Sequence, residues 1–127
     1  MTDAKNPLLA LSKSFAVEMI RLYDSLKRRG GTFALINQLL KCATSIGANV
    51  HEANYASSKP DFINKLQIAL KECYETDYWL DILFESGTLV SDEHKAASDK
   101  CSRIRRMLIS SINTAKGNLQ DHTERKE

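Results

Sequence analysis

The sequence contains few of the residues that form tight turns, with five Gly and two Pro among 127 residues. An all-β domain needs many such turns, so this scarcity disfavours a sheet-based fold. The formal net charge is only +2, which does not by itself predict a nucleic-acid partner. No apolar run approaches the ~20 residues of a membrane-spanning helix, and no apolar signal core follows the N-terminus. We therefore expect a cytoplasmic protein without a membrane partner.

Motifs for metal, redox and catalytic chemistry are also missing. The three cysteines, Cys42, Cys73 and Cys101, include no C-x-x-C pair, so they are poor evidence for a disulfide framework or a zinc site. The sequence has no Glu-x-x-His, which di-iron four-helix bundles use, and no Gly-rich phosphate loop. We therefore expect no metal, no cofactor and no catalytic residue. The protein should not be an enzyme, and its thiols should serve as small core side chains.

Apolar residues recur at three- and four-residue steps along four segments, as in amphipathic helices. The predicted helices cover residues 7–29, 32–56, 59–86 and 91–116 of a single domain, 1–127. Typical capping signals flank them, with Asn6 and Ser58 before two helices and Gly30 and Gly87 after two. Gly117 is expected to end the last helix and to leave a polar, frayed tail at 117–127.

Short connections between such long helices force sequential neighbours to run antiparallel. The predicted fold is therefore all-α, an antiparallel up-down-up-down four-helix bundle. Ala43 and Gly47 lie one turn apart in the second helix. Because Gly costs about 1 kcal/mol relative to Ala inside a helix, Gly47 indicates either close packing against another helix or a kink.

Charge is distributed unevenly along the chain. Residues 1–30 and 91–116 each carry a net charge of +3, whereas residues 58–90 carry −3. The first and fourth helices of such a bundle are neighbours, so their basic residues should merge into one face that fits phosphate backbones. The candidate nucleic-acid contacts are Lys13, Arg21, Lys27, Arg28, Arg29, Arg103, Arg105 and Arg106. The alternative is a solvated charged face with intramolecular ion pairs.

Four polar residues of the middle helices form a second candidate set, consisting of Asn49, Glu52, Glu72 and Glu75. Glu72 and Glu75 are three residues apart and share one side of their helix. Paired carboxylates can do acid–base work, but no nucleophile or metal ligand accompanies these two. We expect all four residues to form hydrogen bonds or ion pairs between helices or subunits.

The second helix carries almost no charge, because Lys41 and Glu52 are its only ionised residues. It has apolar residues on two adjacent stripes, which is more apolar surface than one monomer core can bury. This pattern predicts an oligomer. The opposite net charges of the third helix and of the first and fourth favour head-to-tail contacts between copies.

Two runs of sequence resemble a known bacterial family. The run ATSIGANVHEA at 43–53 resembles the S-x-x-x-N-I-A-E-G signature of four-helix bundle proteins encoded, among other places, as intervening sequences inside large-subunit ribosomal RNA genes. The run ALKECYETDYWL at 69–80 resembles the Glu-rich second signature of that family. The resemblance spans residues 6–114, and the chain departs from the signature at His51 and Ala53.

This resemblance implies an antiparallel four-helix bundle that assembles into a ring-like homopentamer. A protein related to this family is the accessory protein of diversity-generating retroelements, which binds a reverse transcriptase and nucleic acid through a basic surface. The functional hypothesis is therefore an oligomeric, non-enzymatic binding protein for RNA or for a protein–nucleic-acid complex, which it binds through the basic face of the first and fourth helices. The expected partners are other copies of the chain and RNA, DNA or a nucleic-acid-binding protein. The alternative is a structural or protein-interaction module whose basic residues make subunit contacts.

Overall fold

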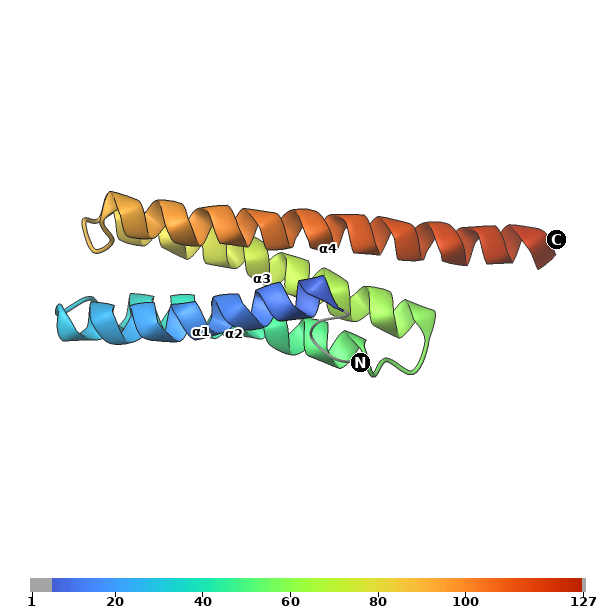
Figure 1. Ribbon diagram of the computed structural model, residues 1–127, viewed down its shortest axis with the longest axis horizontal. Helices are drawn as coiled ribbons and strands as arrows, with labels where there is room; N and C mark the ends of the chain where they lie inside the picture. Colours follow the sequence, from blue (N-terminus) through green and yellow to red (C-terminus); the bar gives the residue numbers. More distant parts are fainter. Residues whose placement is uncertain (1–5, 127) are drawn as a thin grey trace.

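The computed structural model describes residues 6–126, with side chains described as far as residue 118. Four helices follow one another along the chain: α1 (Pro7–Arg28), α2 (Phe33–Ala53), α3 (Lys59–Glu85) and α4 (Ser91–Lys126). They run alternately up and down, and within the described residues no strand is present (Figure 1). The predicted all-α antiparallel four-helix bundle is confirmed. The α2–α3 interface is the most extensive, and α1 touches α4 only lightly.

Capping groups define where the helices begin and end. The side chains of Asn6 and Ser58 accept hydrogen bonds from the backbone N–H groups of Leu9 and Asp61, at 3.1 and 3.2 Å. Gly30 and Gly87 have φ values of 80° and 82°, a left-handed conformation that favours Gly and ends α1 and α3. These four signals are therefore confirmed as the ones that set the helix ends.

The second helix ends three residues earlier than predicted, at Ala53 rather than residue 56. The chain must turn before Ser58, whose extended backbone (φ −156°, ψ 166°) caps α3. The side-chain amide of Asn6 donates to Asn54 Oδ1 at 3.1 Å, and so links the start of α1 to the end of α2. The remaining helix ends, other than the C-terminus of α4, lie within one residue of the predicted positions.

The last helix contradicts the predicted stop at Gly117, because α4 continues to Lys126. Gly117 does not have a positive φ, so it does not form the left-handed cap seen at Gly30 and Gly87. A Gly inside a helix costs only about 1 kcal/mol relative to Ala, and no Pro follows to break the backbone hydrogen bonds. The tail that was expected to be frayed, 117–127, is helical as far as Lys126, and residue 127 lies outside the described residues.

One buried cluster of apolar side chains joins all four helices. It contains large residues such as Phe15, Leu66 and Ile104, with small residues between them. All three cysteines are buried and free, which confirms the prediction that the thiols occupy core positions.

Gly47 marks a close approach of α1 to α2. A Cβ atom placed at Gly47 would lie 3.3 Å from the carbonyl oxygen of Ser12 and 3.4 Å from its carbonyl carbon. Ser12 is fully buried at this crossing, and its hydroxyl donates to the carbonyl oxygen of Leu9 at 3.1 Å. Of the two readings of Gly47, close packing is confirmed.

Gly47→Leu should lower the free energy of unfolding by about 1–3 kcal/mol, because the larger side chain must push α1 away. Gly117→Ala is the matched control, since nothing lies within 4 Å of a Cβ placed there. That control should raise stability by up to about 1 kcal/mol through helix propensity alone. Urea unfolding at a fixed protein concentration measures both changes. A Gly47→Leu variant as stable as the parent would contradict the close approach.

Candidate nucleic-acid interface

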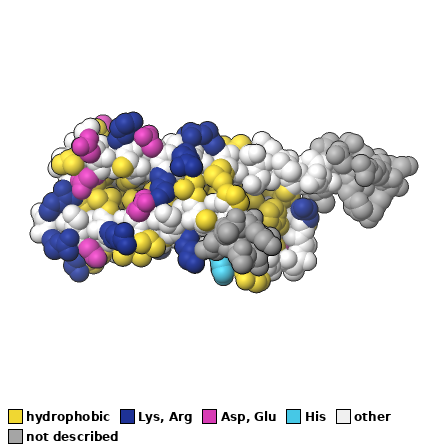
Figure 2. Space-filling view, in the orientation of Figure 1, with side chains coloured by type: hydrophobic (Ala, Val, Ile, Leu, Met, Phe, Trp, Pro, Cys, Tyr) yellow, Lys and Arg dark blue, Asp and Glu magenta, His cyan; other side chains and the backbone are white. Residues whose placement is uncertain are grey.

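Basic side chains lie on both α1 and α4, on either side of a strip of apolar residues (Figure 2). Ion pairs join the two helices along this face. Lys100 Nζ donates to Ser14 Oγ at 2.9 Å and pairs with the Glu18 carboxylate. Arg29 Nη2 pairs with Glu93 Oε2 at 3.0 Å. The bundle therefore brings basic residues of its first and last helices onto one face, but acidic residues accompany them.

Two arginines of α4 lie open to solvent on this face. Arg103 and Arg106 are exposed, and they line a shallow groove of about 500 Å³ with Met107, Ser110 and Ser111. Neither arginine forms a salt bridge with any residue whose side chain the structure describes. Two guanidinium groups and two hydroxyls in one groove are donors of the kind that bind phosphate oxygens.

Arg105 lies on a different side of α4 from its neighbour Arg106. Its Nη1 donates to Asp77 Oδ2 of α3 at 2.9 Å, and its guanidinium lies 5.9 Å from the centre of the Tyr74 ring. Burial raises the pKa of Asp77, and the positive charge of Arg105 opposes that shift. By distance and angle, Asp77 Oδ1 has no hydrogen-bond partner among the residues that the structure describes. Arg105 is therefore a partner of a half-buried carboxylate at the α3–α4 seam.

The predicted nucleic-acid contacts of the first helix also differ in their surroundings. Lys13 lines a groove between α1 and α2. Arg29 is paired with Glu93 across the helices. The remaining three, Arg21, Lys27 and Arg28, are exposed and, among the described side chains, form no salt bridge. These three residues, with Arg103 and Arg106, are the predicted contacts that are exposed and have no salt bridge among the described side chains.

The second candidate set does not converge on one site. Asn49 donates to the Ser45 carbonyl oxygen at 2.9 Å, within its own helix. Glu52 pairs with Lys65 at 3.1 Å and so joins α2 to α3, the kind of interhelical contact that was predicted. The hydrogen bond of Asn49 lies within α2 and is not the predicted interhelical contact, whereas the Glu52–Lys65 pair is one.

Glu72 and Glu75 lie together at the α2–α3 seam. They line a small cavity of about 190 Å³ with Gln38, Lys41 and Ser45 of α2. Partial burial, followed by the neighbouring Glu75 carboxylate, raises the pKa of Glu72. A carboxyl group with a raised pKa favours its protonated form in the folded chain.

This shift predicts a pH dependence for Glu72→Gln. Because the folded chain binds the Glu72 proton more tightly than the unfolded chain, the stability it contributes is lost as the pH rises through its folded pKa. The glutamine variant should therefore be more stable than the parent at neutral pH, and should lose this advantage towards about pH 4. Unfolding curves at several pH values test this. Glu75→Gln removes the neighbouring charge and should therefore make the dependence of stability on pH shallower than in the parent. If the stabilities of Glu72→Gln and the parent changed in parallel with pH, the predicted pKa shift of Glu72 would be contradicted.

Exposed aromatic side chains on α3 form a further surface that was not among the predicted sites. Tyr74 and Tyr78 of α3 are 54% and 59% exposed, and Trp79 lies beside them. The sequence spacing could have predicted this surface, because Tyr74 and Tyr78 are one helical turn apart. Both lie outside the buried stripe of Cys73, Thr76 and Leu80.

Other kinds of site find no support in the part of the chain that the structure describes. No three His, Cys, Asp or Glu side chains gather there in a way that could hold a metal ion. None of its helices is long and apolar enough to cross a membrane. Fold and surface together define a four-helix bundle that presents exposed arginines and lysines on two neighbouring helices.

Comparison with known proteins identifies the family. The sequence profile of the 23S rRNA-intervening sequence protein family matches residues 5–110, and the chain belongs to this family. A solved structure from Bacteroides thetaiotaomicron, described as a protein with unknown function from the S23 ribosomal protein family, is 40% identical, with a TM-score of 0.81. The match covers 83% of this chain and 97% of the Bacteroides chain. Among curated proteins, none matches this sequence.

Proposed function

We propose that this protein is an oligomeric, non-enzymatic binding protein for RNA, or for a protein–RNA complex, and that it binds through the basic face of α1 and α4. The observation that carries the proposal is the pair Arg103 and Arg106, which are exposed and without a salt bridge among the described residues. Nearby acidic residues are already neutralised by other cations, such as Glu18 by Lys100 and Glu93 by Arg29. Phosphates approaching Arg103 and Arg106 would therefore meet little opposing charge.

Membership of the family supports RNA as the nucleic acid. The family is named for an intervening sequence of 23S ribosomal RNA. Arginines that project from a helix into a shallow groove favour contacts to the phosphate backbone, which position the nucleic acid and do not read its sequence.

A second candidate function rests on the cations that are already paired. Arg105, Arg29 and Lys100 each hold a carboxylate of the same chain. Cations used in this way favour a structural or protein-interaction module, in which the remaining basic residues would make subunit contacts.

Binding to RNA and DNA over a range of salt concentrations tests the proposal. A site making 6–10 phosphate contacts should lose about 10³–10⁵ in affinity between 50 and 200 mM salt. Arg103→Gln with Arg106→Gln should weaken binding and reduce the salt slope by about 2, since each lost phosphate contact lowers the slope by about 1.

Lys41→Gln with Lys59→Gln is the matched control, because it removes the same charge from exposed positions on α2 and α3. That control should leave the salt slope unchanged. No binding at 50 mM salt would refute the nucleic-acid function and favour the interaction module. If both double variants lost the same affinity for nucleic acid, the net charge of the protein, and not the α1–α4 face, would attract the nucleic acid.

A further inference from the structure

The groove between α1 and α2 that Lys13 lines has the size of a small-molecule site. This α1–α2 groove has a volume of about 540 Å³, and such sites typically measure about 300–1,000 Å³. Three of the residues that line it, Ala16, Gly47 and Ala48, have little or no side chain. The hollow therefore results from missing side-chain volume where the two helices approach closely, and it is already present in the folded chain.

An aromatic pair lies at the end of this groove nearest the C-terminus of α2. His51 is in the last turn of the helix and Tyr55 follows its end, and their ring centres are 5.3 Å apart. Both rings line the groove, and Tyr55 is 75% exposed. Aromatic rings at a surface are platforms on which nucleobases stack, because every base has a π face.

Polar groups with different roles line the same groove. Lys13 supplies a positive charge. The side-chain oxygen of Asn54 accepts a hydrogen bond from Asn6 at 3.1 Å, so the NH₂ group of Asn54 is the part that can donate to a ligand. The Thr44 hydroxyl donates to the carbonyl oxygen of Leu40 at 2.8 Å, so its oxygen is the part that can accept. The groove thus offers a cation and a donor to a phosphate, and an acceptor to an N–H group of a base.

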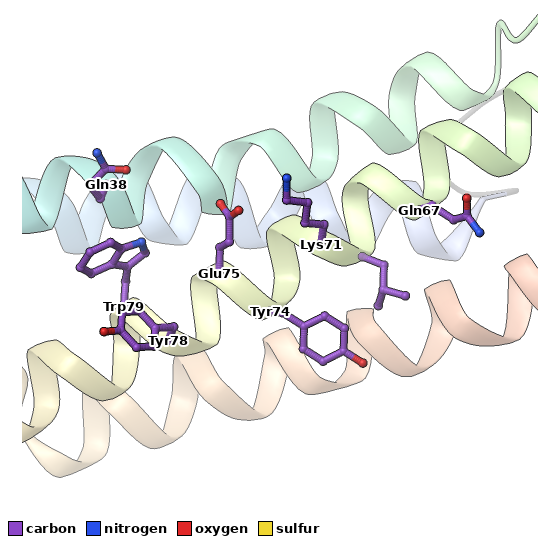
Figure 3. Close-up of a pocket in the computed structure, with 8 residues that line it drawn as sticks. Gln38, Gln67, Lys71, Tyr74, Glu75, Tyr78 and Trp79 are labelled. Carbon is purple, nitrogen blue, oxygen red and sulfur yellow. The ribbon is translucent and has the colours of Figure 1, made fainter.

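The hollow between α2 and α3 differs from this groove in its charges (Figure 3). It is also lined by aromatic residues, which are Tyr74, Tyr78 and Trp79. However, Glu75 accompanies Lys71 there, and Figure 3 shows both of these side chains pointing towards α2. A carboxylate beside the lysine repels a phosphate. No Asp or Glu is among the described residues that line the α1–α2 groove, which is therefore the more favourable of the two hollows for a phosphate.

We propose that the α1–α2 groove binds a nucleotide, with the base against His51 and Tyr55 and the phosphate at Lys13. The inference goes beyond the proposed function and does not rest on it, because this groove shares no residue with the groove of Arg103 and Arg106. A base that carries a phosphate can come from a free nucleotide or from an unpaired nucleotide of an RNA chain. The chemistry recognised is the same in both cases, and the experiment distinguishes the two sources.

Isothermal titration calorimetry with adenosine 5′-monophosphate (AMP) tests the site. AMP should bind saturably, at one site per chain. Adenosine and inorganic phosphate should each bind about 10-fold more weakly or worse, because each provides only one of the two halves of the ligand. An AMP affinity no higher than that of inorganic phosphate would contradict a site for the base.

Three substitutions change the parts of the site separately. Lys13→Gln should weaken AMP binding by about 10-fold or more, because a charge-assisted hydrogen bond is lost, and should leave adenosine binding unchanged. His51→Ala should weaken AMP and adenosine alike by about fivefold or more, because it removes a stacking ring. Ala48→Leu should fill part of the hollow and weaken both ligands by a similar factor. Equal losses of AMP and adenosine in Lys13→Gln would contradict the assignment of the phosphate to Lys13.

Matched controls separate the site from misfolding and from a general effect of charge. Lys116→Gln removes the same charge as Lys13→Gln, and Ala96→Leu adds the same side chain as Ala48→Leu, both at exposed positions of α4. Both controls should bind AMP as the parent does, and circular dichroism should show the same helix content in every variant. If Lys116→Gln weakened AMP binding as much as Lys13→Gln, net charge and not the groove would attract the nucleotide, and the inference would be wrong.

Two RNA hairpins distinguish the sources of the ligand. They share one stem, and only one of them carries a single unpaired adenosine. Tighter binding of that hairpin, which AMP competes away and His51→Ala abolishes, would assign the groove to an unpaired nucleotide of RNA. AMP binding together with equal affinities for the two hairpins would assign it to a free nucleotide.

The inference fails if neither source is bound. No saturable binding of AMP up to about 10 mM, together with equal affinities for the two hairpins, would refute the groove as a nucleotide site. That result would leave the proposed function intact, because the salt dependence of RNA binding in Arg103→Gln with Arg106→Gln tests a different surface. Conversely, AMP binding that persists in this double variant while RNA binding is lost would support the groove as a separate site.

Discussion

The close approach of α1 to α2 at Gly47 is the constraint on which the surfaces of this protein depend. Because Gly47 has no side chain, the backbone of Ser12 packs directly against α2. This contact sets the position of α1 relative to the other helices, since α1 touches α4 only lightly. It therefore also sets the shape of the α1–α2 groove and the distance between the basic residues of α1 and those of α4. A single small residue in the core thus shapes two exposed surfaces.

Ion pairs then divide the basic residues into two groups with different roles. Cations near the helix seams, such as Arg105, Arg29 and Lys100, each hold a carboxylate of a neighbouring helix. Cations that point straight outwards, such as Arg103 and Arg106, lie free of salt bridges among the described side chains. Exposed ion pairs contribute only about 0–1 kcal/mol each, so the seam pairs mainly orient the helices. The outward-pointing group is the part of the basic surface that no ion pair among the described side chains occupies.

Local sequence signals predicted most of the fold. Capping residues and left-handed glycines act within four or five residues of a helix end, so Asn6, Ser58, Gly30 and Gly87 could be read directly from the sequence. The helix end predicted at Gly117 is wrong because a Gly only permits a left-handed cap and does not require one. The burial of the three cysteines followed from their place on the apolar stripes, which depends only on helical periodicity.

The sequence by itself determined that there are four helices, that neighbours run antiparallel, and which stripe of each helix is buried. Only the tertiary structure decided which partner each polar side chain meets, because one residue along a helix turns the side chain by about 100°. Arg105 and Arg106 are adjacent in the sequence, yet one reaches Asp77 of α3 and the other points to solvent. Lys13 likewise lines the groove between α1 and α2. These outcomes depend on the rotation of each helix about its own axis, which the packing of the shared core determines.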